Sequence, residues 1–172
     1  MTPTTSFMGD NVMISAPLQF GSPDPDVTHR DRPAVFGIAE QRGKIALVRI
    51  TRDGKAPFHD LPGGAIEPGE SEGRALAREF VEETGLIISS GEILARADQY
   101  MVKSDGEPVN NRSVLMTAVV EGLDPDQKCE DDHRLAWFDP QEALRVVRHD
   151  SHAWAIAVWL RRQARRAAEQ AA

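Results

Sequence analysis

Residues 64–86 constrain the fold of this chain more than any other segment, because they join a glycine-rich turn to a helix that carries clustered acids. Residues 67–70, Glu-Pro-Gly-Glu, have Pro at position i+1 and Gly at i+2, which favours a type II turn. Ser71 can cap the N-terminus of a helix, and Gly85 can end that helix as its C′ residue. The pattern therefore predicts a loop followed by a helix between Ser71 and Gly85.

Three glutamates of this predicted helix, Glu79, Glu82 and Glu83, stand at positions i, i+3 and i+4. This spacing places three carboxylates on one helix face, where they repel one another unless a cation lies among them. Hard oxygen ligands of this kind suit Mg²⁺ or Mn²⁺. The acids also oppose the helix dipole, because helix stability alone favours Lys or Arg near the C-terminal end. With Glu70 just ahead of the helix, the segment is typical of a site that holds a divalent metal against a phosphate.

The segment resembles the Nudix box, Gly-x5-Glu-x7-Arg-Glu-U-x-Glu-Glu-x-Gly-U, in which U is a bulky apolar residue. All nine specified positions are filled, by Gly64, Glu70, Arg78, Glu79, Phe80, Glu82, Glu83, Gly85 and Leu86. A glutamate-rich surface helix is the plainer interpretation of helix-spaced acids, but nine matches at fixed spacing argue against chance. The box is a small part of the 172-residue chain, so the resemblance indicates chemistry more than substrate.

The resemblance implies an α/β fold, an α/β/α sandwich around a mixed β-sheet. It implies an enzyme that hydrolyses a pyrophosphate linkage in a nucleoside diphosphate derivative or a nucleoside triphosphate, with Mg²⁺ as cofactor and Mn²⁺ as an alternative. Catalysis would rest on Glu82, Glu79 and Arg78, whose planar guanidinium can hold a neighbouring carboxylate rigidly. The implied metal ligands are the backbone carbonyl of Gly64 and the carboxylates of Glu70, Glu79, Glu82 and Glu83.

The general base stays open at this point. In the family that the box resembles, the base is either a box glutamate or an acid on a distant loop. Glu130, Asp131 and Asp132 lie on such a loop, ahead of a strand predicted at residues 135–138. A solvated loop acid is the plainer interpretation of each residue alone, yet the three together are a candidate alternative base.

The substrate stays open as well. Some Nudix branches carry a proline (ADP-ribose hydrolases) or a tyrosine (diadenosine polyphosphate hydrolases) in the stretch where this chain has Val102 and Ser104. The main alternative to an enzyme is a catalytically silent nucleotide-binding or regulatory module with the Nudix fold, although such modules commonly have broken box acids. Isopentenyl diphosphate isomerase, a fold relative, uses a cysteine ahead of the box, where this chain has Phe58, His59 and Asp60.

Composition argues against several classes of protein. The net charge of −7 is unlike that of a nucleic-acid-coating surface, which needs clustered Lys and Arg. Cys129 is the single cysteine, so no disulfide forms within the chain, which fits a reducing compartment. No apolar run approaches the ~20 residues of a membrane span, and the N-terminus lacks the features of a signal peptide. We therefore expect a cytoplasmic protein that binds neither nucleic acid nor a membrane, and the resemblance implies a small-molecule nucleotide as its substrate.

The composition of the chain changes near residue 32. Residues 1–32 are rich in Pro and turn formers, with short apolar pieces at 12–14 and 18–20. They form either a loose tail or an arm that pairs with a second subunit, which would make the protein a homodimer. Residues 33–172 are predicted to form the Nudix domain. Its strands are predicted at residues 34–39, 44–50, 58–61, 86–88, 93–102, 113–121 and 135–138, and its later helices after Asp139 and over residues 151–170.

Overall fold

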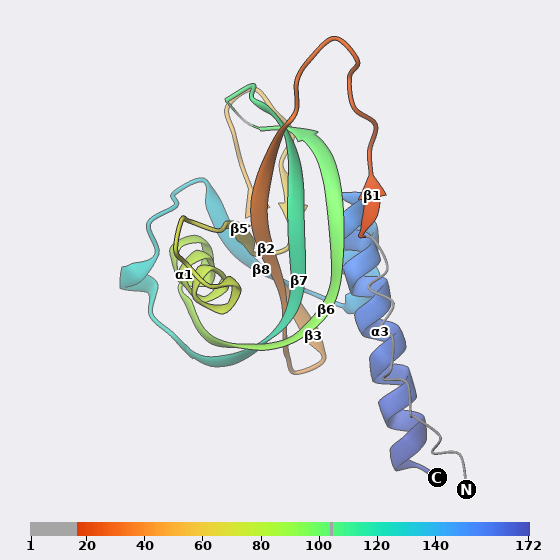
Figure 1. Cartoon of the computed structure of the whole chain (residues 1–172). Helices are drawn as coiled ribbons and strands as arrows, with labels where there is room; N and C mark the ends of the chain where they lie inside the picture. Colours follow the sequence, from red (N-terminus) through yellow and green to blue (C-terminus); the bar gives the residue numbers. More distant parts are fainter. Residues whose placement is uncertain (1–16, 104) are drawn as a thin grey trace, which may run out of the picture.

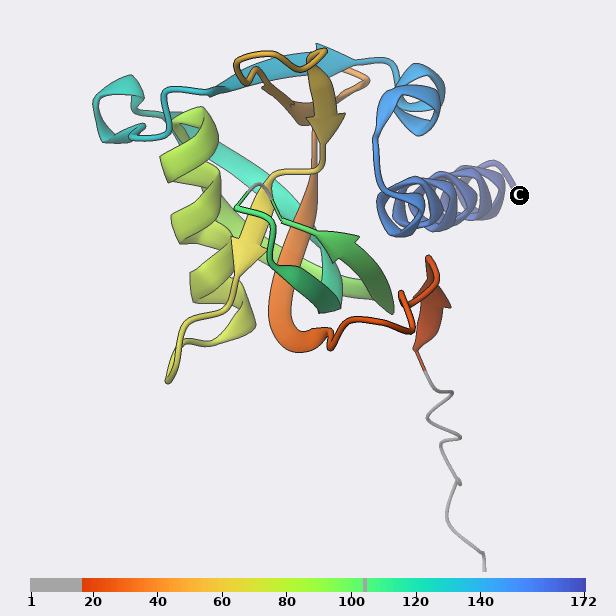
Figure 2. The ribbon, with the colours of Figure 1, turned by 90° about the horizontal axis from the view of Figure 1, so that it is seen from above.

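A mixed β-sheet lies between helices in the computed structural model, which describes residues 17–103 and 105–172. Helix α1 (Glu72–Thr84) covers one face of the sheet, and helices α2 (Pro140–Val146) and α3 (Asp150–Gln170) lie on the other side (Figures 1 and 2). The predicted α/β/α sandwich with a mixed sheet is therefore confirmed. The apolar piece at residues 12–14 lies outside the described residues.

Eight strands form the sheet within the described ranges, in the order β1-β6-β7-β2-β3-β4, with β5 paired to β2 and β8 paired to β3. The β1–β6 and β2–β7 pairs are parallel, and the other pairs are antiparallel. The bounds are Leu18–Phe20 (β1), Arg30–Gln41 (β2), Lys44–Ile50 (β3), Phe58–Asp60 (β4), Gly63–Ala65 (β5), Leu86–Val102 (β6), Pro108–Leu123 (β7) and His133–Phe138 (β8).

Local sequence explains the hairpin of β2 and β3. Arg42 and Gly43 join these strands with φ angles of 55° and 76°, the left-handed values that a two-residue type I′ turn requires. Residues 34–39 and 45–48 are unbroken buried runs. Such runs are typical of strands that helices cover on both faces, so β2 and β3 belong to the centre of the sandwich.

The structure corrects the sequence prediction at two strand boundaries. The sequence predicts no strand between residues 61 and 86, but Gly63–Ala65 forms β5, antiparallel to β2 with Gly64 opposite Val35. The strands predicted at residues 86–88 and 93–102 are one continuous β6, with irregular register between Ser90 and Ile93. Both differences arise from pairing with distant strands, which the local residue preferences of a segment do not report.

Helix α1 has the caps that the sequence predicts. The Ser71 hydroxyl accepts a hydrogen bond from the first turn, and Gly85, at a φ of 76°, donates its amide to the carbonyl of Val81. Leu76 and Phe80 are fully buried in the cluster between α1 and the sheet. The caps and the buried stripe together fix which face of the helix carries the acids.

Helix α3 packs on the opposite face of the sheet through its N-terminal half. Ile156 is fully buried and Trp159 nearly so, and the ring of His152 lies 4.4 Å from that of Phe36 between centroids. No helix in the described ranges is both long enough and apolar enough to cross a membrane.

Part of the predicted N-terminal arm belongs to the sheet. Strand β1 runs parallel to β6, with Leu18 opposite Ala97, and Phe20 lies beside Trp154 of α3 at 6.2 Å between ring centroids. Strand β2 begins at Arg30, inside the segment that composition assigns to the arm. The apolar piece at residues 18–20 thus covers an edge of its own sheet, and the homodimer stays a prediction.

Candidate active site

Strand β5 lies so close to α1 and to β2 that a side chain at either of its two glycines would collide, at Gly64 with α1 and at Gly63 with β2. A Cβ atom on Gly64 would lie 2.6 Å from the carboxyl group of Glu79. A Cβ atom on Gly63 would lie 2.2 Å from the carbonyl oxygen of Val35, and the φ of 140° at Gly63 disfavours any other residue. The amide of Gly63 donates a hydrogen bond to Oε2 of Glu83 at 2.9 Å. The glycines therefore bring the β5 backbone directly against the box carboxylates.

Arg78 lies at the centre of a network of carboxylates. Its Nε and Nη2 donate to the two oxygens of Glu70, each at 3.0 Å, and Nη2 also donates to the carbonyl of Ala65 at 2.9 Å. Its Nη1 donates to Glu79 at 2.9 Å and to Glu82 at 3.1 Å. The hydrogen bond to Arg78 lowers the pKa of Glu70, and these partners raise the pKa of Arg78. Arg78 thus contacts three of the four carboxylates that the sequence predicts as metal ligands.

Two of the box glutamates are buried. Glu79 is 8% exposed and Glu83 is 5% exposed, whereas Glu82 lies at the rim of the cluster. Burial raises the pKa of Glu79 against the opposing effect of Arg78, and burial raises the pKa of Glu83 well above its usual range. A nearby cation stabilises the charged form of such carboxylates. A cluster of hard oxygen donors with this need for positive charge fits Mg²⁺ or Mn²⁺.

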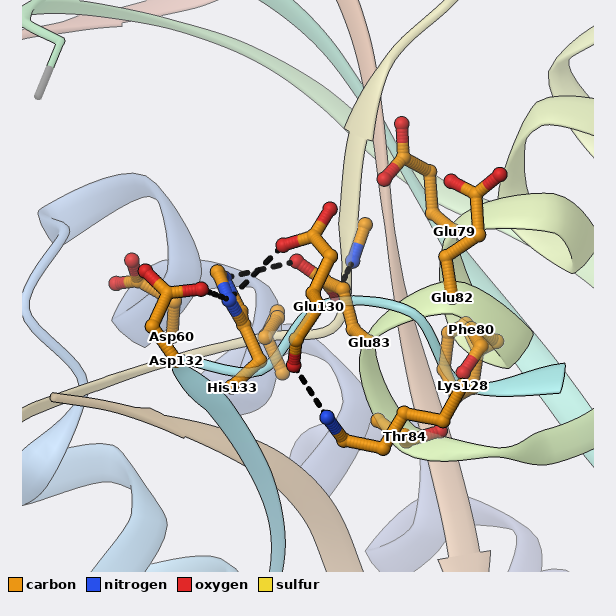
Figure 3. Close-up of polar contacts among 12 residues, drawn as sticks. Asp60, Glu79, Phe80, Glu82, Glu83, Thr84, Lys128, Glu130, Asp132 and His133 are labelled. Atoms are coloured by element: carbon orange, nitrogen blue, oxygen red, sulfur yellow. Dashed lines mark hydrogen bonds and ion pairs between the residues drawn. The ribbon is translucent and has the colours of Figure 1, made fainter. Parts of the chain in front are cut away.

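The loop between β7 and β8 adds another carboxylate to the cluster. The backbone amides of Cys129 and Glu130 both donate to the carbonyl of Glu82, at 3.0 and 3.1 Å, near the C-terminal end of α1 where carbonyls lack helical partners. One carboxylate oxygen from each of Glu79, Glu82 and Glu130 lies within 4.8 Å of the others. The structure therefore brings Glu130, one of the candidate bases, into the group of potential metal ligands (Figure 3).

The two neighbours of Glu130 lie elsewhere. Asp131 is exposed. Asp132 accepts a hydrogen bond from Nε of Arg52 at 3.3 Å and contacts Nδ1 of His133 at 2.8 Å, on the side of that ring away from the box helix (Figure 3). Of the three loop acids, all within the described residues, Glu130 is the one whose carboxylate reaches the cluster.

His133 is a site residue that sequence reasoning misses. It is 7% exposed, its Nδ1 lies 2.9 Å from Oε2 of Glu130, and its Nε2 lies 3.4 Å from Oε1 of Glu83. Burial lowers the pKa of His133, but its contacts with Glu130 and Asp132 outweigh burial and raise the pKa overall. Figure 3 shows the imidazole between Asp132 on one side and the carboxylates of Glu83 and Glu130 on the other. A single histidine after an acidic loop carries no spacing signal that could have revealed this position.

A pocket of about 170 Å³ opens beside the cluster, and Gly64, Glu83 and His133 form part of its wall. A second buried acid, Asp60, lines the same pocket at 6% exposure. Burial raises the pKa of Asp60 to about 6, although Nη2 of Arg148 lies 2.5 Å from its Oδ2 and opposes the shift. Four cationic side chains also line the pocket: Arg32, Arg52, Lys103 and Arg148. A pocket with this excess of positive charge, next to a metal-binding cluster, suits a phosphorylated ligand.

The sequence model of the NUDIX domain matches residues 28–162 of this chain. The chain belongs to the Nudix family. The CTP pyrophosphohydrolase of Escherichia coli K12 is 32% identical over 113 residues, which cover 64% of this chain and 78% of that protein. The ADP-ribose pyrophosphatase of Methanocaldococcus jannaschii is 30% identical over 105 residues, which cover 61% of this chain and 59% of that protein.

Solved Nudix structures agree with this assignment. A NUDIX hydrolase from Nitrosomonas europaea superposes with a TM-score of 0.65 and 27% identity, over 76% of this chain and 88% of that one. The predictions of family and enzyme class are confirmed: the chain is a Nudix-type pyrophosphohydrolase, an enzyme that acts on acid anhydrides.

Proposed function

We propose that this Nudix enzyme uses Mg²⁺ to hydrolyse a pyrophosphate linkage in a nucleoside diphosphate derivative or a nucleoside triphosphate. The observation that carries the proposal is the gathering of carboxylates from α1 and from the β7–β8 loop around Arg78, next to a cation-lined pocket. The names of similar proteins include one hydrolase of a nucleoside triphosphate and one of a nucleoside diphosphate derivative. Both substrate classes therefore enter the test.

Carboxylates of the cluster would hold the metal, together with the backbone carbonyl of Gly64. When bound, the metal would neutralise the charge that develops on the phosphoryl oxygens as water attacks phosphorus. The raised pKa values of the buried carboxylates support this assignment, because such groups gain most from a cation. The proposed ligands are Glu70, Glu79, Glu82 and Glu83, and Glu130 from the loop lies beside them as the candidate base.

Side chains of the cluster also orient the ligands and accept the proton of the attacking water. Arg78 orients Glu79 and Glu82 through its Nη1, so both carboxylates keep one position when substrate binds. Glu130 or Glu82 accepts the proton of the attacking water, and the far phosphate leaves with the electrons of the broken P–O bond. Of the loop acids, Glu130 is favoured as base because its carboxylate lies within reach of the cluster.

A substrate panel tests the proposal. Purified protein is assayed with Mg²⁺ and with Mn²⁺ on nucleoside triphosphates, ADP-ribose and nucleoside diphosphate sugars. We expect turnover of at least one compound, loss of activity in EDTA and recovery on adding the metal back. Activity that persists in EDTA would contradict the metal requirement. Binding of a nucleotide without turnover under either metal would support the catalytically silent module instead.

A further inference from the structure

Arg32 stands out among the cations of the pocket beside the carboxylate cluster. It lies on β2, is partly buried and lines the pocket whose wall includes Gly64 and Glu83. Its Nη1 donates to Oδ1 of Asn111 at 3.0 Å. Within residues 17–103 and 105–172, the Arg32 guanidinium has no carboxylate oxygen within 4.0 Å and no hydrogen-bond partner besides Asn111, so its remaining N–H groups are available to a ligand.

The other cations of this pocket have acidic partners. Arg148 pairs with Asp60 at 2.5 Å, and Arg52 pairs with Asp132 at 3.3 Å. Lys103 pairs with Glu107 at 2.7 Å and also with an acid of the same turn. These pairs leave Arg32 as the pocket cation whose charge is not matched inside the described part of the chain.

The sheet fixes the position of Arg32. Arg32 and Asn111 stand opposite one another in the parallel β2–β7 ladder. Asn111 is 3% exposed, and its Nδ2 contacts Sδ of Met101 at 3.1 Å, which leaves its Oδ1 for the guanidinium. A buried amide oxygen therefore holds Arg32 in place without neutralising its charge.

A charged, partly buried Arg32 is unfavourable in free energy unless an anion enters the pocket. Burial penalises the charge of Arg32 and lowers its pKa, against the more distant attraction of Glu79. A guanidinium that is partly desolvated and prepositioned binds phosphate oxygens with paired N–H groups. The uncharged ribose or sugar of a nucleoside diphosphate derivative would leave Arg32 without a counter-charge.

We propose that Arg32, oriented by Asn111, binds a phosphate outside the linkage that is cleaved, and that the enzyme therefore prefers nucleoside triphosphates to nucleoside diphosphate derivatives. This inference rests on the proposed function. It assigns the scissile linkage to the carboxylate cluster and a further phosphate to the adjoining pocket. Asn111 is in this scheme a positioning residue, because it acts through Arg32.

The first experiment compares substrates that share a nucleoside: ATP with ADP-ribose, and UTP with UDP-glucose. We expect wild-type kcat/KM to be at least ~10-fold higher for the triphosphate of at least one pair. Arg32→Met should lower kcat/KM for that triphosphate by about 30-fold, the loss expected for one charge-assisted contact, and for its diphosphate partner by less than ~3-fold. Arg96→Met is the matched control, since Arg96 is exposed on β6 and pairs with Glu72.

A second variant tests whether the unpaired charge of Arg32, rather than the presence of its side chain, sets the preference for triphosphates. Asn111→Asp would give Arg32 a carboxylate partner in place of the amide oxygen. We expect it to lower triphosphate preference in the same direction as Arg32→Met, while Arg32→Lys should retain part of the preference. A uniform loss of activity on both members of each pair would overturn the proposal, as would a wild-type preference for ADP-ribose and UDP-glucose.

Direct binding distinguishes failure of this inference from failure of the proposed function. Inorganic tripolyphosphate and pyrophosphate are titrated calorimetrically in Ca²⁺ buffer, where a divalent cation can neutralise the acid cluster. The wild type should bind tripolyphosphate more tightly than pyrophosphate, and Arg32→Met should remove that difference. Equal affinities in the wild type would overturn the inference even if hydrolysis is observed. If the wild type binds tripolyphosphate more tightly than pyrophosphate but hydrolyses no compound of the substrate panel, the result would support the phosphate subsite and count against the proposed hydrolysis.

Discussion

The backbone amide of Gly63 donates a hydrogen bond of 2.9 Å to the buried carboxylate of Glu83, linking the short strand β5 to the last turn of α1. Strand β5 in turn pairs with β2, with Gly63 opposite Phe36. The position of a proposed metal ligand therefore depends on the sheet as well as on its own helix. Because burial penalises the charge of Glu83, removing that charge while keeping the shape of the side chain should affect chemistry more than folding.

Glu83→Gln keeps the shape of the side chain and its acceptor for the Gly63 amide but removes the charge. We expect at least ~100-fold loss in kcat at saturating Mg²⁺, about 2.7 kcal/mol of transition-state stabilisation. The midpoint temperature of thermal unfolding in EDTA should be unchanged or slightly higher, because the variant lowers like-charge repulsion in the cluster. Glu121→Gln, an exposed acid on β7, is the control. Near-native turnover of Glu83→Gln would remove this residue from the site.

Glu130→Gln tests the choice among the loop acids. Its carboxylate lies in the cluster, whereas Asp131 is exposed. We expect kcat of Glu130→Gln to fall by about 100-fold or more, the usual contribution of a positioned general base, and Asp131→Asn to remain within ~2-fold of wild type. The pH–rate profile should lose its acidic limb if Glu130 is the base. A retained limb with modest loss of kcat would assign that role to Glu82.

Gly64→Ala tests the close approach of β5 to α1. The added Cβ would lie 2.6 Å from the carboxyl group of Glu79 and must displace it. The Mg²⁺ concentration for half-maximal activity should rise by roughly 10-fold or more, as for other disturbed ligand shells. Gly122→Ala adds the same methyl where the nearest atom, on Ile87, is 3.9 Å away, and should leave metal activation unchanged. Equal metal dependence of the two variants would contradict the predicted role of Glu79.

The raised pKa of Asp60 predicts that the stability of the folded protein depends on pH. Its pKa in the folded protein, about 6, lies above the usual 3.8, so the folded state binds the proton more tightly than the unfolded state does. Protonated Asp60 therefore stabilises the folded protein below pH 4. This stabilisation is lost as the pH rises through 6, and the unfolding free energy falls by ~3 kcal/mol. The difference in unfolding free energy between wild type and Asp60→Asn should therefore fall over that window in chemical denaturation. A flat difference would show that the pKa of Asp60 is not raised.

The N-terminal arm remains a candidate dimer contact. Its piece at residues 18–20 already covers the edge of β6, so a dimer would have to use other parts of the arm or the outer edge of β1. Light scattering of the full chain and of a chain lacking residues 1–27 decides this. We expect a dimer that becomes monomeric on truncation, with the circular dichroism of the domain retained. A monomeric full chain, or a truncated chain that stays dimeric, would count against the arm as contact.

The sequence by itself determined what depends on short-range spacing. The caps Ser71 and Gly85, the helix between them and the carboxylates of Glu79 and Glu83 follow from helical geometry, which repeats every few residues and needs no knowledge of the rest of the chain. The strands predicted at residues 34–39 and 44–50 likewise follow from local composition, and the turn between them is local too, since Gly43 adopts a positive φ. These local rules, with the box resemblance, were sufficient for the family and for the α/β/α sandwich.

Only the tertiary structure decided which distant residues join the box. Arg32 and Asn111 are 79 residues apart and meet because β2 and β7 pair in parallel. Glu130 and His133 reach the cluster because the amides of their loop cap a free carbonyl at the end of α1. Such contacts are set by sheet register and by loop docking, which bring together residues whose separation along the chain carries no periodic signal. Their side chains decide the charge and shape of the pocket beside a metal-binding helix that the sequence already specifies.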